Sequence, residues 1–211
     1  VLLNSLLPDA VASELPDIES APRDKILDHA AGVLRRAGTM KLQCASLDLG
    51  LEKLAWAVRD GDREIEPVLQ RRKQVFAALI PEARRMGCSL CHALRHPAKP
   101  VTQELVDITL QFIEDVGNPG CGLMLTVVLD ELQDLDPAAV LTPFLEELAV
   151  LRIHYEPALG IRFAGDDQQR WAQYLKENEY TGDVVFAPAA GALPVFAAEL
   201  PRIASDQATY W

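Results

Sequence analysis

The chain has 211 residues, of which 49% are hydrophobic and 24% are charged, and its formal net charge is −11. This size and composition are typical of a globular protein that buries a large core without disulfides. The negative charge opposes binding to a nucleic-acid backbone or to an anionic membrane surface, because both carry the same sign. No apolar run approaches the roughly 18 residues of a membrane-spanning helix. We therefore expect neither a nucleic acid nor a membrane as a partner.

Helical periodicity dominates the first 116 residues. Apolar side chains recur on one face in several successive segments, and Gly or Pro follows most of them. The expected helices cover residues 23–37, 45–60, 63–80, 81–96 and 102–116. Pro81 is expected to separate the third of these helices from the fourth, since proline breaks or kinks a helix interior.

The second half of the chain is less uniform. A helix is predicted over residues 137–153, and a further one follows Asp167. Residues 122–137 fit either a helix with an apolar stripe or a buried parallel strand from Leu123 to Leu129, and the helical neighbours favour the helix. After Tyr180 the sequence is rich in Gly, Pro and Ala and has one strand-like triplet, Val184-Val185-Phe186.

These patterns predict an all-α fold, a bundle of seven or eight helices. The bundle would span residues 1–180, and residues 181–211 would form an irregular C-terminal segment packed on it. The alternative is an α/β, P-loop-like core, which applies if Leu123 to Leu129 form a strand.

The chain has four cysteines, Cys44, Cys88, Cys91 and Cys121, which are few and irregularly spaced. A small secreted domain held by disulfides has a denser set, so reduced thiols and a cytoplasmic location are expected. The first residues include no cationic segment of the kind that opens a signal peptide, although removal of such a peptide before Val1 would leave the same sequence.

The segment Cys88-Ser89-Leu90-Cys91-His92 is the most specific motif in the chain. On the helix expected over residues 81–96, Cys88, His92 and His96 lie on the side opposite the apolar face, and Cys91 lies at the edge of that face. This arrangement predicts a polar stripe that faces solvent, a cofactor or a partner.

Three interpretations of this stripe stay open. The motif resembles the haem attachment site of c-type cytochromes, and that resemblance implies thioether bonds from Cys88 and Cys91, His92 as an iron ligand, electron transfer and a periplasmic location. Thiolates and imidazoles also suit zinc or an iron–sulfur cluster, with Cys44 or Cys121 completing the ligand set. The favoured interpretation has no cofactor and uses the stripe for contact with a protein partner or a second copy of the chain.

A second motif lies at residues 125–135, LTVVLDELQDL. It resembles the Walker B strand of P-loop ATPases of the AAA and STAND type, which implies that Asp130 contacts Mg²⁺ and that Glu131 acts as the base. The chain contains no G-x-x-x-x-G-K-[ST] segment, so such an ATPase core would be incomplete. Taken together, the patterns favour a soluble acidic helical protein that acts by binding, in an adaptor or regulatory role, over an enzyme.

Overall fold

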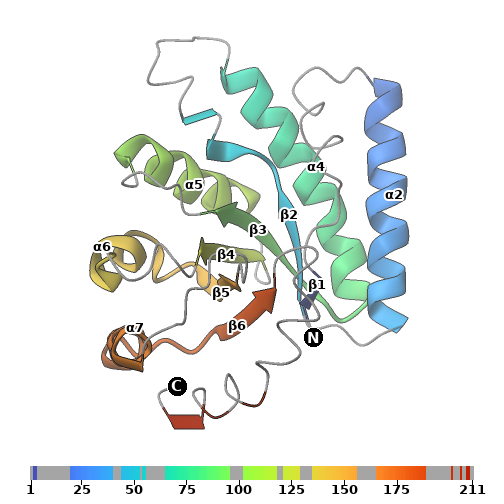
Figure 1. Ribbon diagram of the computed structural model, residues 1–211. Helices are drawn as coiled ribbons and strands as arrows, with labels where there is room; N and C mark the ends of the chain where they lie inside the picture. Colours follow the sequence, from blue (N-terminus) through green and yellow to red (C-terminus); the bar gives the residue numbers. More distant parts are fainter. Residues whose placement is uncertain are drawn as a thin grey trace. The chain divides into compact units, whose positions relative to one another are not determined.

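The computed structural model describes residues 2–3, 20–39, 44–52, 54–55, 65–95, 102–117, 121–128, 135–155, 165–188, 201, 205, 208 and 209. Strands and helices alternate along these residues (Figure 1). The strands are β1 (Leu2–Leu3), β2 (Cys44–Asp48), β3 (Ser89–Arg95), β4 (Cys121–Val128), β5 (Leu148–Tyr155) and β6 (Asp183–Pro188). The helices are α2 (Ser20–Thr39), α4 (Ile65–Arg85), α5 (Gln103–Val116), α6 (Pro137–Leu141), the 3-10 helix η2 (Thr142–Phe144) and α7 (Gly165–Glu177). The fold is therefore α/β, and the predicted all-α bundle is wrong.

The chain forms two compact units, and strand β4 contributes to both. The first unit contains residues 1–94 and 101–124, and its strand order is β1-β2-β3-β4. The second unit contains residues 95–100 and 125–211, and its strand order is β4-β5-β6. The pairs β1–β2, β2–β3 and β5–β6 are parallel. The predicted division at residue 180 stays a prediction.

Strand β3 replaces the helix that was expected over residues 81–96. Helix α4 continues through Pro81 to Arg85, and Gly87, whose φ of +68° places it in the left-handed region, follows its end. The N–H of Cys88 bonds to the Ala83 carbonyl and the N–H of Gly87 to the Arg84 carbonyl, which is the Schellman pattern of a helix end. Leu90 to Leu94 then form a nearly continuous buried run, as expected of a parallel strand covered on both faces.

Two other helical predictions are contradicted where the chain forms a strand. Strand β2, Cys44–Asp48, replaces the start of the expected 45–60 helix, and its first four residues are buried, whereas residues 51, 52, 54 and 55 are helical as predicted. Cys121–Val128 is strand β4, so the strand interpretation of residues 122–129 was the correct one. The β-branched residues Thr126, Val127 and Val128 favour an extended backbone.

Helix α5 confirms the predicted 102–116 helix. Thr102 caps its first turn by accepting a hydrogen bond from the Leu105 N–H, and Gly117, in the left-handed region, ends it. Helix α2 likewise contains the predicted 23–37 helix. The predicted 137–153 helix is only partly correct, because α6 and η2 are followed by strand β5. The triplet Val184-Val185-Phe186 lies in strand β6.

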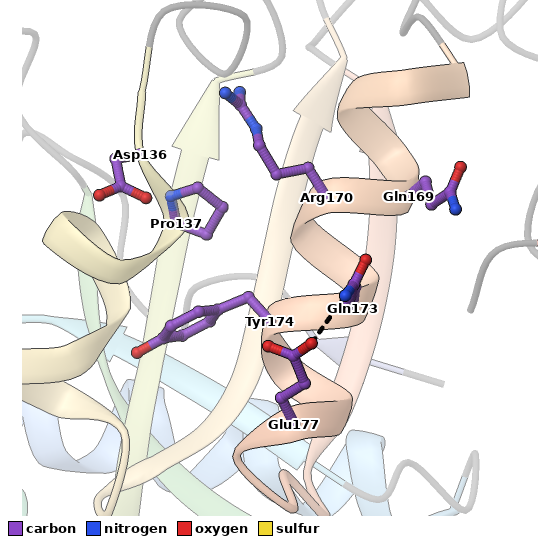
Figure 2. A pocket seen from close by; sticks show the side chains of 7 residues that line it. All are labelled: Asp136, Pro137, Gln169, Arg170, Gln173, Tyr174 and Glu177. Atoms are coloured by element: carbon purple, nitrogen blue, oxygen red, sulfur yellow. Dashed lines mark hydrogen bonds between the residues drawn. The ribbon is translucent and has the colours of Figure 1, made fainter.

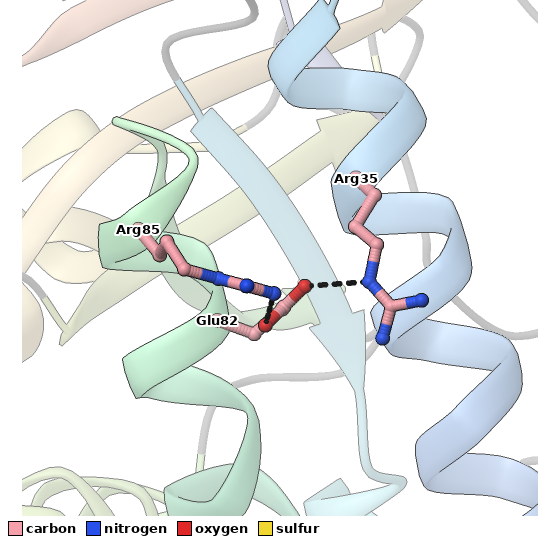
Figure 3. A network of polar contacts seen from close by, with 3 residues as sticks. All are labelled: Arg35, Glu82 and Arg85. Atoms are coloured by element: carbon pink, nitrogen blue, oxygen red, sulfur yellow. Dashed lines mark hydrogen bonds and ion pairs between the residues drawn. The ribbon is translucent and has the colours of Figure 1, made fainter.

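In the first unit, α2 and α4 lie side by side and share an ion-pair network (Figures 1 and 3). Glu82 on α4 accepts from Arg35 Nε of α2 at 2.9 Å and also pairs with Arg85, one turn along its own helix. These two arginines lower the pKa of the Glu82 carboxyl. The network links the surfaces of the two helices.

No helix within the described residues is long and apolar enough to cross a lipid bilayer.

Candidate functional site

Ligands of parallel α/β proteins bind at the carboxyl ends of the strands, where the loops that follow the strands meet. In the second unit two of these strand ends carry cationic or ionisable side chains. Arg95 is the last residue of β3, and Arg152 and His154 lie near the end of β5. Because side chains alternate along a strand, Arg152 and His154 share one face of β5, and the fully buried Leu151 and Ile153 occupy the other.

Arg152 is an unusual residue for a buried strand. Only 8% of it is exposed, and its Nε has no hydrogen-bond partner among the described residues. Burial lowers the pKa of its guanidinium, and the nearby charge of Arg95 lowers it further. We call Arg152 and Arg95 the arginine pair. Two cations on nearby strand ends can bind an anion or stabilise a negative oxygen.

A cavity of about 410 Å³ lies between α6 and α7 in the same unit (Figure 2). Seven residues line it: Asp136, Pro137, Gln169, Arg170, Gln173, Tyr174 and Glu177. Within it the Gln173 amide donates to Glu177 Oε1 at 2.7 Å, and the Tyr174 hydroxyl lies 2.8 Å from Thr142 Oγ1. Asp136 caps α6 by accepting from the Ala138 N–H at 3.1 Å. The lining is polar, and its two carboxylates are engaged in local hydrogen bonds, Asp136 as the cap of α6 and Glu177 with Gln173.

All four cysteines of the chain lie near the amino ends of three neighbouring strands in the first unit. Cys44 and Cys121 are the first residues of β2 and β4, Cys88 directly precedes β3, and Cys91 is the third residue of β3. The Sγ atoms of Cys44 and Cys91 are 3.3 Å apart, and all four thiols are free.

The environment of Cys88 and Cys91 keeps these two thiols protonated. Burial raises the pKa of Cys88 to about 11, and the nearby Cys44 adds to this effect. The pKa of Cys91 is raised by its hydrogen bond with Cys44 and by burial. Thiolates, not thiols, are nucleophiles and metal ligands. Within the part of the chain that the structure describes, no three Cys, His, Asp or Glu side chains come close enough together to hold a metal ion. The predicted zinc or iron–sulfur site stays a prediction.

His92 does not lie on an exposed stripe. It is fully buried, and its ring centroid is 5.3 Å from that of Phe112 on α5. Burial lowers its pKa to about 3. The Leu47 backbone lies near the ring and partly offsets this effect, but the geometry between them is not that of a hydrogen bond.

Because Cys91 and His92 are consecutive in a strand, their side chains point to opposite faces. The helical projection that placed Cys88 and His92 on one exposed face, with Cys91 at its edge, is therefore wrong. His96, Asp130 and Glu131, the other predicted site residues, lie outside the described residues.

The arginine pair was missed by the sequence reasoning. One signal for it was available: Arg152 interrupts an otherwise apolar segment, Leu148 to Ile153, and a charge within such a run is buried if the run is a strand. The segment was assigned to the predicted 137–153 helix, so this strand signal was not used.

No protein-family model matches the sequence. No curated protein matches it either.

Solved structures, in contrast, resemble the chain in backbone, although only weakly in sequence. The apo form of 3-keto-D-glucoside 4-epimerase from E. coli matches with a TM-score of 0.59 and 12% identity, over 90% of this chain and 74% of that one. A D-tagatose 3-epimerase-like protein matches with a TM-score of 0.58 and 10% identity, over 97% of this chain and 78% of that one. A xylose isomerase domain protein from Planctomyces limnophilus matches with a TM-score of 0.54 and 11% identity, over 99% of this chain and 76% of that one.

These likenesses establish the fold: parallel strands alternating with helices, as in part of the xylose isomerase-like TIM barrel. They overturn the prediction of a helical binding protein, together with its electron-transfer and P-loop ATPase alternatives, because each of these required a different architecture. Contact with a protein partner or with a second copy of the chain stays a prediction.

Proposed function

We propose that the chain is a sugar epimerase or isomerase. The observation that supports this proposal is the backbone likeness to the E. coli 3-keto-D-glucoside 4-epimerase over 90% of the chain. One fold hosts many reactions, so the likeness alone does not choose a substrate. The xylose isomerase domain protein and the D-tagatose 3-epimerase-like protein point to the same class of chemistry.

This class of reaction moves a proton at a carbon next to a carbonyl group. A base removes the proton, the electrons pass to the carbonyl oxygen, and a proton returns to the other face of the same carbon or to the neighbouring carbon. The protein must therefore supply an acid–base group and a polar site that orients the sugar. A TIM barrel carries such groups at the carboxyl ends of its strands.

His154 is the described residue best placed for the proton transfer. It is half-buried, and it shares a face with Arg152 near the carboxyl end of β5. An imidazole can accept a proton and return it near neutral pH. We assign His154 the role of acid–base residue in the proposed reaction.

The experiment is a product analysis with a panel of carbonyl sugars: D-tagatose, D-fructose, L-ribulose, D-xylose and a 3-keto-glucoside. Each is incubated with the purified chain, with and without added Mg²⁺ or Mn²⁺, and the products are separated by chromatography. We expect conversion of at least one sugar to an epimer or isomer. His154→Gln should lower that rate by roughly 10²–10⁴-fold, the usual contribution of general acid–base catalysis. Lys176→Gln, an exposed change on α7, is the matched control and should retain the full rate.

A further inference from the structure

Arg152 has a buried charge for which the described part of the chain supplies no counter-charge. It is 8% exposed, its Nε has no hydrogen-bond partner, and no ion pair joins it to a described carboxylate. A buried cation is tolerated only when hydrogen bonds or an opposite charge compensate it. This residue therefore requires an anion from elsewhere.

Arg72 shows what a compensated buried arginine looks like in the same protein. It is 3% exposed and its Nε, like that of Arg152, has no hydrogen-bond partner among the described residues, but its Nη1 donates to the Gly50 carbonyl at 2.9 Å. The carboxylate of Asp48 raises its pKa, partly offsetting the effect of burial. Arg72 thus ties α4 to the end of β2 and needs no external partner. The charge that acts on Arg72 is negative, that of Asp48, whereas the charge that acts on Arg152 is positive.

The residue that carries this positive charge is Arg95. It ends strand β3, belongs to the same unit as Arg152, and its positive charge acts on the Arg152 guanidinium. The protein as a whole carries a net charge of −11, so it would repel an anionic ligand everywhere except at such a local cationic site.

The place of the pair in the fold indicates which anion it binds. Arg95 and Arg152 lie toward the carboxyl ends of their strands, where barrel enzymes bind substrate, and Arg152 shares its face of β5 with His154. We propose that Arg152 binds an oxyanion group of the substrate, so that the sugar carries a phosphate or a carboxylate. This inference rests on the proposed function and specifies the substrate class of the same site.

The chemistry of the guanidinium fits both oxyanions. Its planar fork of N–H donors makes two parallel hydrogen bonds to a carboxylate or a phosphate, and such charge-assisted bonds are stronger than neutral ones. Neutral sugars offer no charge that would balance the buried guanidinium of Arg152. We therefore expect an anionic sugar to bind more tightly than its neutral parent.

The test measures binding without turnover. Isothermal titration at constant ionic strength uses inorganic phosphate, D-fructose 6-phosphate, D-galacturonate and neutral D-fructose as probes. We expect at least one anionic probe to bind at least tenfold more tightly than D-fructose. Comparing the affinities of D-fructose 6-phosphate and D-galacturonate shows whether the site prefers a phosphate or a carboxylate. Equal affinity for charged and neutral probes would overturn the inference.

Variants locate the bound anion. Arg152→Met should lower the affinity for the anionic probe by about tenfold to a hundredfold. Arg152→Lys keeps the charge but not the planar fork of donors, and it should lower the affinity less. Arg36→Met, an exposed change on α2, is the charge-matched control and should leave binding unchanged. Arg170→Met tests the cavity between α6 and α7. Loss of binding in this variant, with no loss in Arg152→Met, would contradict the proposal.

Failure of this inference differs from failure of the proposed function. A chain that epimerises neutral sugars but binds no anion through Arg152 retains the proposed function and loses the inference. A chain that binds the anionic probe through Arg152 but converts no sugar in the panel, charged or neutral, retains the anion site and loses the proposed function. If Arg152 acts only on a negative oxygen that forms during the reaction, Arg152→Met lowers the rate but leaves probe affinity unchanged, and the inference is wrong.

Discussion

The Sγ atoms of Cys44 and Cys91 are 3.3 Å apart, although the two residues are not opposite each other in the sheet. In the parallel register of β2 and β3, Cys44 lies opposite Ser89, and Cys91 lies opposite Ser46. A rise of about 3.3 Å per residue and a strand spacing of about 4.8 Å place the two Cα atoms roughly 8 Å apart. Disulfides join Cα atoms about 4.4–6.8 Å apart, so the sheet keeps these two thiols close together but unlinked.

The first prediction concerns this thiol pair. When the native protein is treated with a mild oxidant, we expect no disulfide between Cys44 and Cys91, because the bond would require the strands to shift. Peptide mapping by mass spectrometry under non-reducing conditions makes the measurement. The protein unfolded in denaturant and oxidised in the same way is the control. A linked Cys44–Cys91 peptide from the native sample would show that β2 and β3 do not keep this register.

The second prediction concerns the reactivity of Cys88. Its pKa of about 11, raised by burial, keeps the thiol protonated at pH 8. Relative to a thiol with the ordinary value of 9.0, the thiolate fraction falls about a hundredfold. Alkylation of Cys88 in the native protein should therefore be slow at pH 8 and should rise with a midpoint near pH 11. Rapid labelling at pH 8 would argue against the buried position.

The third prediction concerns His92 and acid stability. Its folded-state pKa of about 3 lies below the unfolded value of about 6.5, so the folded form keeps the ring neutral while the unfolded form gains a proton. The stabilising contribution is therefore complete above pH 6.5 and is lost as the pH falls from 6.5 toward 3. The loss is up to about 1.4 kcal/mol per pH unit.

The measurement compares the wild type with His92→Phe, whose ring suits the contact with Phe112. Urea unfolding of both proteins between pH 4 and pH 8 gives two stability curves. Other groups contribute equally to both curves, so the difference isolates the imidazole. Parallel curves would mean that His92 titrates normally and is accessible to water.

The fourth prediction contrasts the two buried arginines. In the absence of ligand, Arg152→Met should raise the free energy of unfolding by about 1–3 kcal/mol, because it removes a buried cation with no counter-charge. Arg72→Met should lower it by a similar amount, since the Gly50 carbonyl loses its donor and Asp48 loses a nearby positive charge. Denaturant unfolding of both variants at neutral pH makes the comparison. Destabilisation of the same size in both would indicate that Arg152 has a structural partner within the chain.

The sequence predicted the exposed, amphipathic elements and missed the buried ones. Helix α5 has a capping threonine, an apolar stripe and a terminal glycine, and each of these signals is local. Strands β2 and β3 carry no alternation because both of their faces are covered, and their Leu, Ala and Cys residues also fit a helical spacing. Gly87, after Arg84 and Arg85, was a helix-stop signal that would have ended α4 before β3.

The candidate site was harder to predict because it depends on neighbours far apart in the sequence. Arg95 and Arg152 come together only through the strand order, which no local pattern encodes. The four cysteines illustrate the opposite case. Two of them, Cys88 and Cys91, belong to the most conspicuous motif, and the fold gathers all four near the amino ends of three strands. Burial nevertheless raises the pKa of Cys88 and Cys91 and thereby makes these two thiols poor nucleophiles.

The most direct test of the proposed sugar chemistry is hydrogen exchange in D₂O. Proton transfer next to a carbonyl replaces the substrate's C–H by C–D even when the net conversion is small. NMR of the recovered neutral and phosphorylated sugars reports the exchanged carbon, with His154→Gln as the control. We predict deuterium at a carbon adjacent to the carbonyl in the presence of the wild type, and a strongly reduced rate in the variant. Unchanged protons in every sugar, under conditions where a known epimerase exchanges them, would contradict the proposal.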